Sequence, residues 1–282
     1  MKFIGIINVK KACILLNICL LSFIDPASAG THGPTGFNAL VYDKIVAFRN
    51  MDYRGSCWFN HDTIPKHHRQ EKSEDWEVLF DGKNTGKFRG VNSDTFPSNA
   101  WEIEGGTLFV KNHAKGADII TREEYSNFEL FFDFKLTRTA NSGIKYFVAE
   151  IKNNSTGTMM WGGPEYQIID DYNHPAVKDH KDEKGSTAAL YLLYAPENKK
   201  LLPAGQWNTA KIIAEGNHVE HWLNSVKVVS YERGTGEFRR RMATTKFKDY
   251  DNYGELSGGH IMITDHDGDK VYFRNIRIKP LK

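Results

Sequence analysis

From Trp76 to the C-terminus, short runs of β-prone residues alternate with turn residues, and this pattern constrains the fold more than any other feature of the chain. The run FELFFDFKL at 128–136 is apolar at every second position, and three of the four positions between are charged. A period of two places successive side chains on opposite faces of a strand. Many such runs with little helical periodicity predict an all-β fold, an antiparallel β-sandwich or jelly roll.

The turn residues divide this region into individual elements. A diglycine, Gly105-Gly106, predicts a hairpin between strands at 101–104 and 107–110. The sequence Asn141-Ser-Gly143 is interpreted as a turn, and one short helix is expected within the charged stretch 232–257. The other predicted strands are 77–80, 128–136, 144–148, 163–171, 188–194, 207–214, 218–223, 226–231, 260–264 and 271–278.

The first 29 residues have the pattern of an export signal. Three lysines among the first eleven residues precede an apolar run at 12–24, and Ala27-Ser-Ala29 fits a cleavage site. The apolar run is short for a membrane span. We therefore expect a signal peptide at 1–29, export to the periplasm or the medium, and no integral membrane segment in the mature chain. Asn17-Ile18 before Cys19 makes a poor lipidation site, so a lipoprotein ranks second.

Residues 30–75 are interpreted as an N-terminal extension of undetermined fold, and residues 76–282 as the β-sandwich domain. Cleavage of the signal would leave only Cys57, so the mature chain could form no internal disulfide. The net charge of +2 and the lack of a dense basic patch argue against nucleic acid as a partner. No GxGxxG or phosphate-loop motif is present, which argues against a nucleotide enzyme.

Polar residues inside the predicted strands are candidates for a site. Glu165 and Gln167 share one face of their strand, whereas Tyr166 and Ile168 share the other. The pair could line a site on a sheet, or it could belong to a solvated outer face. Lys145 similarly lies opposite the apolar face of its strand, as a site residue or as an outward charge.

Two histidines have similar alternatives. His221 lies on one face of its predicted strand, and its neighbours Glu220 and Trp222 lie on the other. His221 could be a site residue, or Glu220 and His221 could form ordinary cross-strand pairs. His266 lies in an acidic stretch, DHDGD, that resembles half a calcium loop but lacks the downstream acid. We interpret that stretch as an ordinary acidic turn.

Common hydrolase signatures are missing from the sequence. It contains no GxSxG nucleophile frame and no HExxH motif. An ordinary glycosidase needs two placed carboxyl groups, and sequence cannot give their separation. Gln167 stands where sandwich endoglucanases often carry an acid, which weakens that chemistry. The candidate carboxyls are Glu129, Asp133, Glu165, Asp170 and Asp171.

Several motifs in order resemble one known family, and the resemblance covers Trp76 to Lys282. On these motifs the chain resembles the 3-keto-disaccharide hydrolase domain family. The resemblance implies a concanavalin A-like jelly roll that is exported and cleaves glycosides oxidised at C3. Residues 30–75 have no counterpart in the family, and Asp267 makes one loop more acidic than expected. The matching stretches are WEVLFDG (76–82), NSGI (141–144), GPEYQIIDD (163–171), GNHVEHWLN (216–224), DH (265–266) and FRNIRIK (273–279).

The implied chemistry begins with a ketone at C3, which acidifies the proton on C2. The glycosidic oxygen on C1 can then leave by elimination, and water can add afterwards. Such a site needs a base near C2, a cation or donor at the C3 oxygen, and an acid for the leaving group. We expect Glu165 or His221 as base, in one pocket, and Lys145 or a divalent metal ion at the enolate. The metal is left undetermined. Predicted substrate-binding residues are Gln167, Asn141, Asp133, Asp171, Tyr191, Trp222, His266 and Arg274.

Two other functions remain open at this point. A non-catalytic carbohydrate-binding module could use aromatic side chains as stacking platforms, although most aromatics in a sandwich are core. A conventional glycoside hydrolase would cleave unoxidised glycosides. In all three cases the expected partner is an oligosaccharide or glycoside. The candidate stacking residues are Trp101, Trp161, Trp207, Trp222 and Tyr191.

Overall fold

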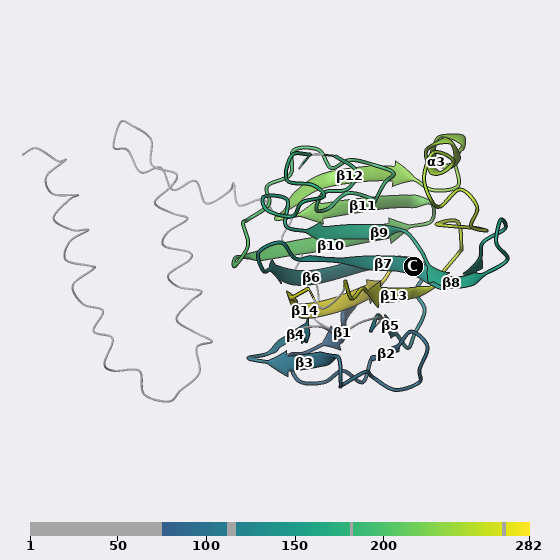
Figure 1. The fold of residues 1–282 in the computed structure, drawn as a ribbon. Coiled ribbons are helices and arrows are strands. Elements are labelled where there is room, and N and C mark those ends of the chain that lie inside the picture. The colour runs from purple at the N-terminus through teal and green to yellow at the C-terminus, as the bar shows by residue number, and fades with distance from the viewer. Residues whose placement is uncertain (1–74, 112–116, 181–182, 267–268) are drawn as a thin grey trace, which may run out of the picture. The chain divides into compact units, whose positions relative to one another are not determined.

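The computed structural model describes residues 75–111, 117–180, 183–266 and 269–282. The predicted signal peptide and residues 30–74 of the predicted extension lie outside the described residues. The described part contains two antiparallel sheets and one helix, and in Figure 1 strands β9, β7 and β13 run in front of β10, β6 and β14. This confirms the predicted concanavalin A-like antiparallel sandwich. Within the described ranges no helix is long and apolar enough to cross a membrane.

The larger sheet has eight strands in the described region, in the order β12-β11-β10-β6-β14-β4-β3, with β1 paired to β14. The predicted diglycine hairpin joins β3 and β4, and both glycines have positive φ angles of 55° and 76°. The strands of the larger sheet are β1 (Glu77–Phe80), β3 (Trp101–Glu104), β4 (Thr107–Val110), β6 (Phe128–Leu136), β10 (Trp207–Glu215), β11 (His218–Leu223), β12 (Val226–Glu232) and β14 (Val271–Pro280).

The smaller sheet has six strands in the described region, in the order β2-β5-β13-β7-β8, with β9 also paired to β7. Strands β8 and β9 pair with different halves of the long strand β7. The strands of the smaller sheet are β2 (Phe88–Gly90), β5 (Ile119–Thr121), β7 (Asn141–Lys152), β8 (Met159–Gly162), β9 (Glu165–Ile169) and β13 (His260–Ile263).

The core lies between the inner faces of the two sheets. The alternation in β6 works as predicted, because Phe128, Leu130, Phe132 and Phe134 are all fully buried. Across the core, Tyr166 of β9 meets Phe132 edge to face at 5.6 Å. Burying each such aromatic ring contributes about 2 kcal/mol to stability. The side chains that alternate with this apolar set therefore emerge on the two outer faces of the sandwich.

Two predicted elements near the outer face of the smaller sheet are wrong. Asn141–Gly143 is the first part of strand β7 and not a turn, because its backbone pairs with β9 from Ile169 to Gln167. The predicted strand 188–194 is irregular and makes only isolated bridges. Positive φ angles at Ala188 (70°) and Leu192 (64°) break the extended path there. This loop instead borders the end of β9.

The short helix expected within 232–257 is α3 (Gly236–Met242), which lies at one end of the sandwich in Figure 1. Thr235 caps it by accepting from the Phe238 backbone N–H at 3.2 Å. The Phe238 ring stacks on Tyr231 at 5.8 Å, which attaches the helix to the larger sheet. After the helix, the chain returns to the smaller sheet, where Tyr250 bridges Asn153. This path carries the segment 246–253 over strands β7, β8 and β9.

Candidate active site

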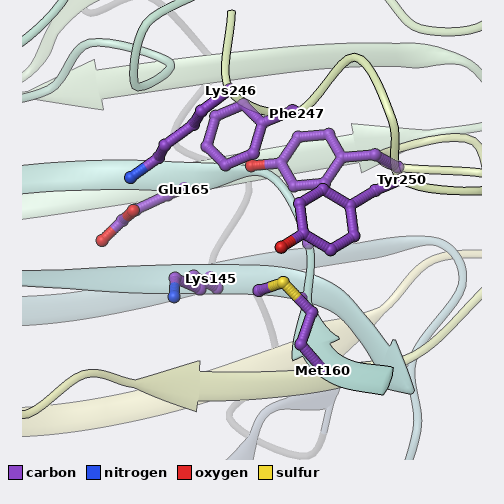
Figure 2. A pocket seen from close by; sticks show the side chains of 9 residues that line it. Lys145, Met160, Glu165, Lys246, Phe247 and Tyr250 are labelled. Atoms are coloured by element: carbon purple, nitrogen blue, oxygen red, sulfur yellow. The ribbon is translucent and has the colours of Figure 1, made fainter. Parts of the chain in front are cut away.

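Two adjoining hollows lie on the outer face of the smaller sheet and share Lys145, Glu165 and Lys246 (Figure 2). Their volumes are about 210 and 230 Å³. We call them the apolar half and the polar half of one pocket. The apolar half is also lined by Met160, Gly162, Gly163, Phe247, Tyr250 and Tyr253. The polar half is also lined by Asp118, Asn141, Gln167, Tyr191, Thr264, Asp265 and His266.

Strand register brings the shared residues together. Lys145 of β7 lies directly opposite Glu165 of β9, and Gly143 lies opposite Gln167. Opposite residues of an antiparallel pair project from the same face, so all four belong to the outer surface. A side chain at Gly143 would place its Cβ 2.1 Å from Glu165 Oε1. The glycine therefore leaves the space that the Glu165 carboxylate occupies.

The Glu165 carboxylate is buried, with 7% of the residue exposed. Burial raises its pKa, while the positive charges of Lys145, His266 and Lys246 oppose that rise, and the nearby Asp118 adds to it. No described residue gives this carboxylate a hydrogen bond. A buried carboxyl with a raised pKa and no structural partner, inside a pocket, is typical of an acid–base group.

Asp118 supplies a second carboxyl to the polar half. Burial raises its pKa, against the hydrogen bond from the Asp265 backbone N–H to Oδ1 at 2.8 Å and the charge of Lys145. The Asp265 side chain in turn accepts from the Ala117 backbone N–H at 3.2 Å. These bonds join the loop after β13 to the residue before β5, so the second carboxyl is held by backbone contacts.

Lys246 reaches the pocket from the segment after α3. Its ammonium lies 5.0 Å from the centre of the Tyr191 ring and 5.3 Å from that of Phe247. In Figure 2 the ammonium groups of Lys246 and Lys145 lie on either side of the Glu165 carboxylate. The site thus presents two cations beside one buried acid.

The structure does not place His221 in this pocket. Its ring is fully buried between the sheets, where Nδ1 donates to the Ala188 carbonyl at 3.0 Å and Nε2 accepts from the Tyr146 hydroxyl at 2.8 Å. Burial lowers its pKa to about 4. The prediction that Glu165 and His221 share one pocket is wrong: Glu165 projects outward from the smaller sheet, whereas His221 projects inward from the larger one.

The other predicted site residues divide into two groups. Asn141, Gln167, Tyr191 and His266 line the polar half together with Glu165 and Lys145. The remaining four line neither half of this pocket. Asp133 and Arg274 form an ion pair at 3.1 Å on the larger sheet, where Trp222 also lies beside Lys211. Asp171 is buried against Lys199 at 2.6 Å.

Three of these four corrections have one physical cause, and Asp171 has another. Periodicity shows which face of its own strand a residue occupies, but β6, β11 and β14 belong to the other sheet. Asp171 follows the end of β9, where its Oδ1 accepts from the Thr187 backbone N–H at 2.8 Å. Its carboxylate is therefore used in holding the loop.

Sequence reasoning missed several pocket residues. Asp118 and Thr264 flank short strands and carry no periodic signal. Lys246 and the aromatic residues after it belong to the stretch 232–257, which is charged and contains glycine but shows no pattern that would predict a site. Their place depends on contacts between distant parts of the chain. Of the described residues, no three His, Cys, Asp or Glu side chains are arranged to hold a metal ion.

The comparisons with known proteins concern the family and the fold. A 3-keto-disaccharide hydrolase from Bacteroides thetaiotaomicron is 34% identical over 230 residues, which cover 72% of this chain and 78% of that protein. A crystal structure from Parabacteroides distasonis, provisionally named a glycosyl hydrolase, matches with a TM-score of 0.65 and 32% identity over 76% of this chain and 97% of that one. A second structure from that organism, named in the same way, matches with a TM-score of 0.52 and 25% identity over 73% of this chain and 99% of that one.

The family predicted from the motifs is confirmed by a match that covers almost the whole described region. The family model described as the 3-keto-alpha-glucoside-1,2-lyase-like domain matches residues 75–279. With the Bacteroides relative, this settles membership. The chain belongs to the 3-keto-α-glucoside-1,2-lyase-like domain family.

Proposed function

We propose that this protein is an enzyme that cleaves the glycosidic bond of 3-keto-glycosides, starting with removal of the proton on C2. The observation that carries the proposal is the buried Glu165 carboxyl, which accepts no hydrogen bond from any described residue and lies beside Lys145 and Lys246. Elimination next to a ketone needs a base at C2 and positive charge at the C3 oxygen. Family membership and the name of the Bacteroides relative support the same substrate class.

In the first step, Glu165 takes the C2 proton, and the electron pair of the C2–H bond delocalises onto the C3 oxygen as an enolate. A base is most effective when its pKa is close to the working pH, and burial moves the pKa of Glu165 in that direction. The ammonium groups of Lys145 and Lys246 stabilise the enolate oxygen. One well-placed donor of this kind contributes about 3 kcal/mol to transition-state stabilisation.

In the second step, the enolate electrons form a C1–C2 double bond, and the C1–O bond breaks with its electron pair on the leaving oxygen. That oxygen takes a proton, for which the raised pKa of Asp118 makes its carboxyl a suitable donor. Water then adds across the double bond, with hydroxyl on C1 and a proton on C2, and exchange with solvent removes the proton from Glu165 and restores the one that Asp118 gave. Atoms and charge balance without a redox partner, because the ketone is present again at the end.

His221 has a positioning role in this proposal. It holds the Ala188 carbonyl, and the Ala188 backbone N–H donates to the Gln167 carbonyl at 2.8 Å. In the same loop the Tyr191 N–H donates to the Glu165 carbonyl at 3.0 Å. The buried ring therefore fixes the loop that borders the polar half.

The test compares wild type with Glu165→Gln on a 3-keto-glucoside that has a chromogenic leaving group. The substitution keeps the size of the side chain and removes the acid, so we expect a loss of about 100-fold or more in kcat/KM. In heavy water, elimination and hydration leave deuterium at C2 of the released sugar; a sample of that sugar incubated with enzyme corrects for later exchange. Full activity of Glu165→Gln, or cleavage of the unoxidised glucoside at the same rate, would refute the proposal.

We also propose that the protein is exported, on the pattern of residues 1–29. Expression of the full chain should give a mature protein that begins at Gly30. Intact-mass analysis of the fractionated cells checks this, and full-length protein confined to the cytoplasm would contradict it.

A further inference from the structure

We propose that the substrate's leaving group is an apolar ring, such as an aromatic aglycone, and that it binds in the apolar half of the pocket. This inference rests on the proposed function, because it assigns the two halves to the two parts of a 3-keto-glycoside. It starts from a contrast in chemistry: the two halves share Lys145, Glu165 and Lys246 but differ in everything else that lines them.

The polar half suits a sugar ring. Asn141, Gln167 and Thr264 offer amide and hydroxyl groups, and Gln167 Nε2 donates to Asn141 Oδ1 at 3.3 Å, which orients both amides. Asp118 and His266 add further hydrogen-bonding groups at the same surface. A volume of about 230 Å³ bounded by such groups fits one hydroxyl-rich ring.

The apolar half is built from stacked rings and a flat floor. Phe247 stacks on Tyr253 at 4.2 Å with 13° between their planes, and Met160 of β8 lines the same half (Figure 2). At Gly163 a Cβ would lie 2.4 Å from the Tyr146 carbonyl oxygen, so the backbone itself forms the floor. Apart from the shared charged groups, the tyrosines supply the only polar side-chain atoms among the described residues that line this half.

The shared residues place the reacting centre at the boundary between the two halves, because Glu165 must reach C2 and a lysine must reach the C3 oxygen. The amide and hydroxyl groups of the polar half then assign the oxidised ring to that side. The substituent on C1 then extends across that boundary toward Met160 and Phe247. A second sugar there would lose water from several hydroxyls with few groups to replace it, which disfavours binding. An apolar ring has no hydroxyl groups that would lose their water, and it would gain contact with the aromatic side chains.

The experiment compares benzyl and methyl 3-keto-glucosides, whose leaving alcohols have similar acidity. We expect wild type to cleave the benzyl compound with a kcat/KM roughly tenfold or more above that of the methyl compound, as for other apolar pockets. Phe247→Ala should bring the ratio close to one, because only the benzyl compound loses its aromatic contact. The control Trp222→Ala removes an aromatic ring from the larger sheet and should keep the wild-type ratio.

Phe247 is largely buried, so Met160→Ala serves as a second variant should Phe247→Ala fail to fold. A wild-type ratio near one, or a ratio that both pocket variants leave unchanged, would overturn the inference while the proposed function stands. A 3-keto-disaccharide cleaved better than the benzyl compound would overturn it as well. If neither compound is cleaved, the proposed function fails. In that case saturation-transfer NMR with benzyl glucoside still tests binding in the apolar half. Saturation of the benzyl ring by wild type that disappears in the pocket variants would support the inference. No saturation of the ring by wild type would refute it.

Discussion

Gly143→Ala should inactivate the enzyme without unfolding it, although the substitution adds one methyl group to a strand. The added Cβ would lie 2.1 Å from Glu165 Oε1 and 2.9 Å from its Cδ and Cγ atoms. Ordinary contact begins at 3.4 Å, so the carboxylate must move by about 3.4 − 2.1 = 1.3 Å. A displacement of about 1 Å at a reacting group can lower the rate about 100-fold. We expect a loss of that size in kcat/KM on a 3-keto-glucoside.

Stability should change little in the same variant. Alanine in a strand is favoured over glycine by about 0.5–1 kcal/mol, which offsets part of the displacement of the Glu165 side chain. Thermal unfolding of the two proteins checks this. The matched control is Gly90→Ala in β2 of the same sheet, where the nearest atom, Ser93 Cβ, lies at 3.4 Å. That variant should keep both activity and melting temperature.

A double-mutant cycle with Glu165→Asp identifies the cause. If the added methyl group acts only by displacing the carboxylate, Gly143→Ala should add far less than 100-fold to the loss already caused by Glu165→Asp. Two losses that simply multiply would show that the methyl group acts elsewhere on the sheet. Full activity of Gly143→Ala alone would refute the placement of the catalytic carboxylate over Gly143.

Three further predictions concern the surroundings of the site. Lys246→Met should lower kcat by about 100-fold through loss of enolate stabilisation, and an unchanged kcat would contradict that role. Because burial lowers the pKa of His221 from 6.5 to about 4, the unfolded chain binds more protons as pH falls through that window. Stability to urea should therefore drop by about 3 kcal/mol between these values, and His221→Gln should remove that part of the pH dependence; identical slopes would contradict it. Lys199→Met removes the ammonium that pairs with the buried Asp171 carboxylate and should lower the free energy of unfolding by about 3–5 kcal/mol, and a loss below 1 kcal/mol would contradict this.

The sequence predicts the sandwich well because a period of two carries direct information about burial. In β6 the apolar set faces the core as expected, and the hairpin at Gly105-Gly106 forms where the turn residues predict it. The failures lie where the backbone departs from that rule. The β-prone run 188–194 is bent out of a sheet by positive φ angles at Ala188 and Leu192, which no residue type in the run requires.

Three residues of the predicted site follow from the same periodicity. Glu165, Gln167 and Lys145 share an outer face because their strands pair in the register that the structure shows. His221 was indistinguishable from them in the sequence, since a polar residue between strand formers can face either water or the core. The sequence gives no sign that Lys246 belongs to the site. The helix and loops that bring it over β9 are held by contacts between distant parts of the chain, such as Phe238 on Tyr231.

Two acidic residues from the same short segment show why burial alone does not identify a catalytic group. Asp171 and Glu165 are both buried, but Asp171 meets Lys199 at 2.6 Å and accepts a backbone hydrogen bond from Thr187. Its charge is compensated in the folded chain, as a structural carboxylate requires. Glu165 has two lysines nearby, yet no described residue donates a hydrogen bond to its carboxylate, and burial keeps its pKa raised. In the proposed mechanism this unpaired state leaves the Glu165 carboxylate available for a proton taken from the substrate, and this difference from Asp171 is why we assign the base to Glu165.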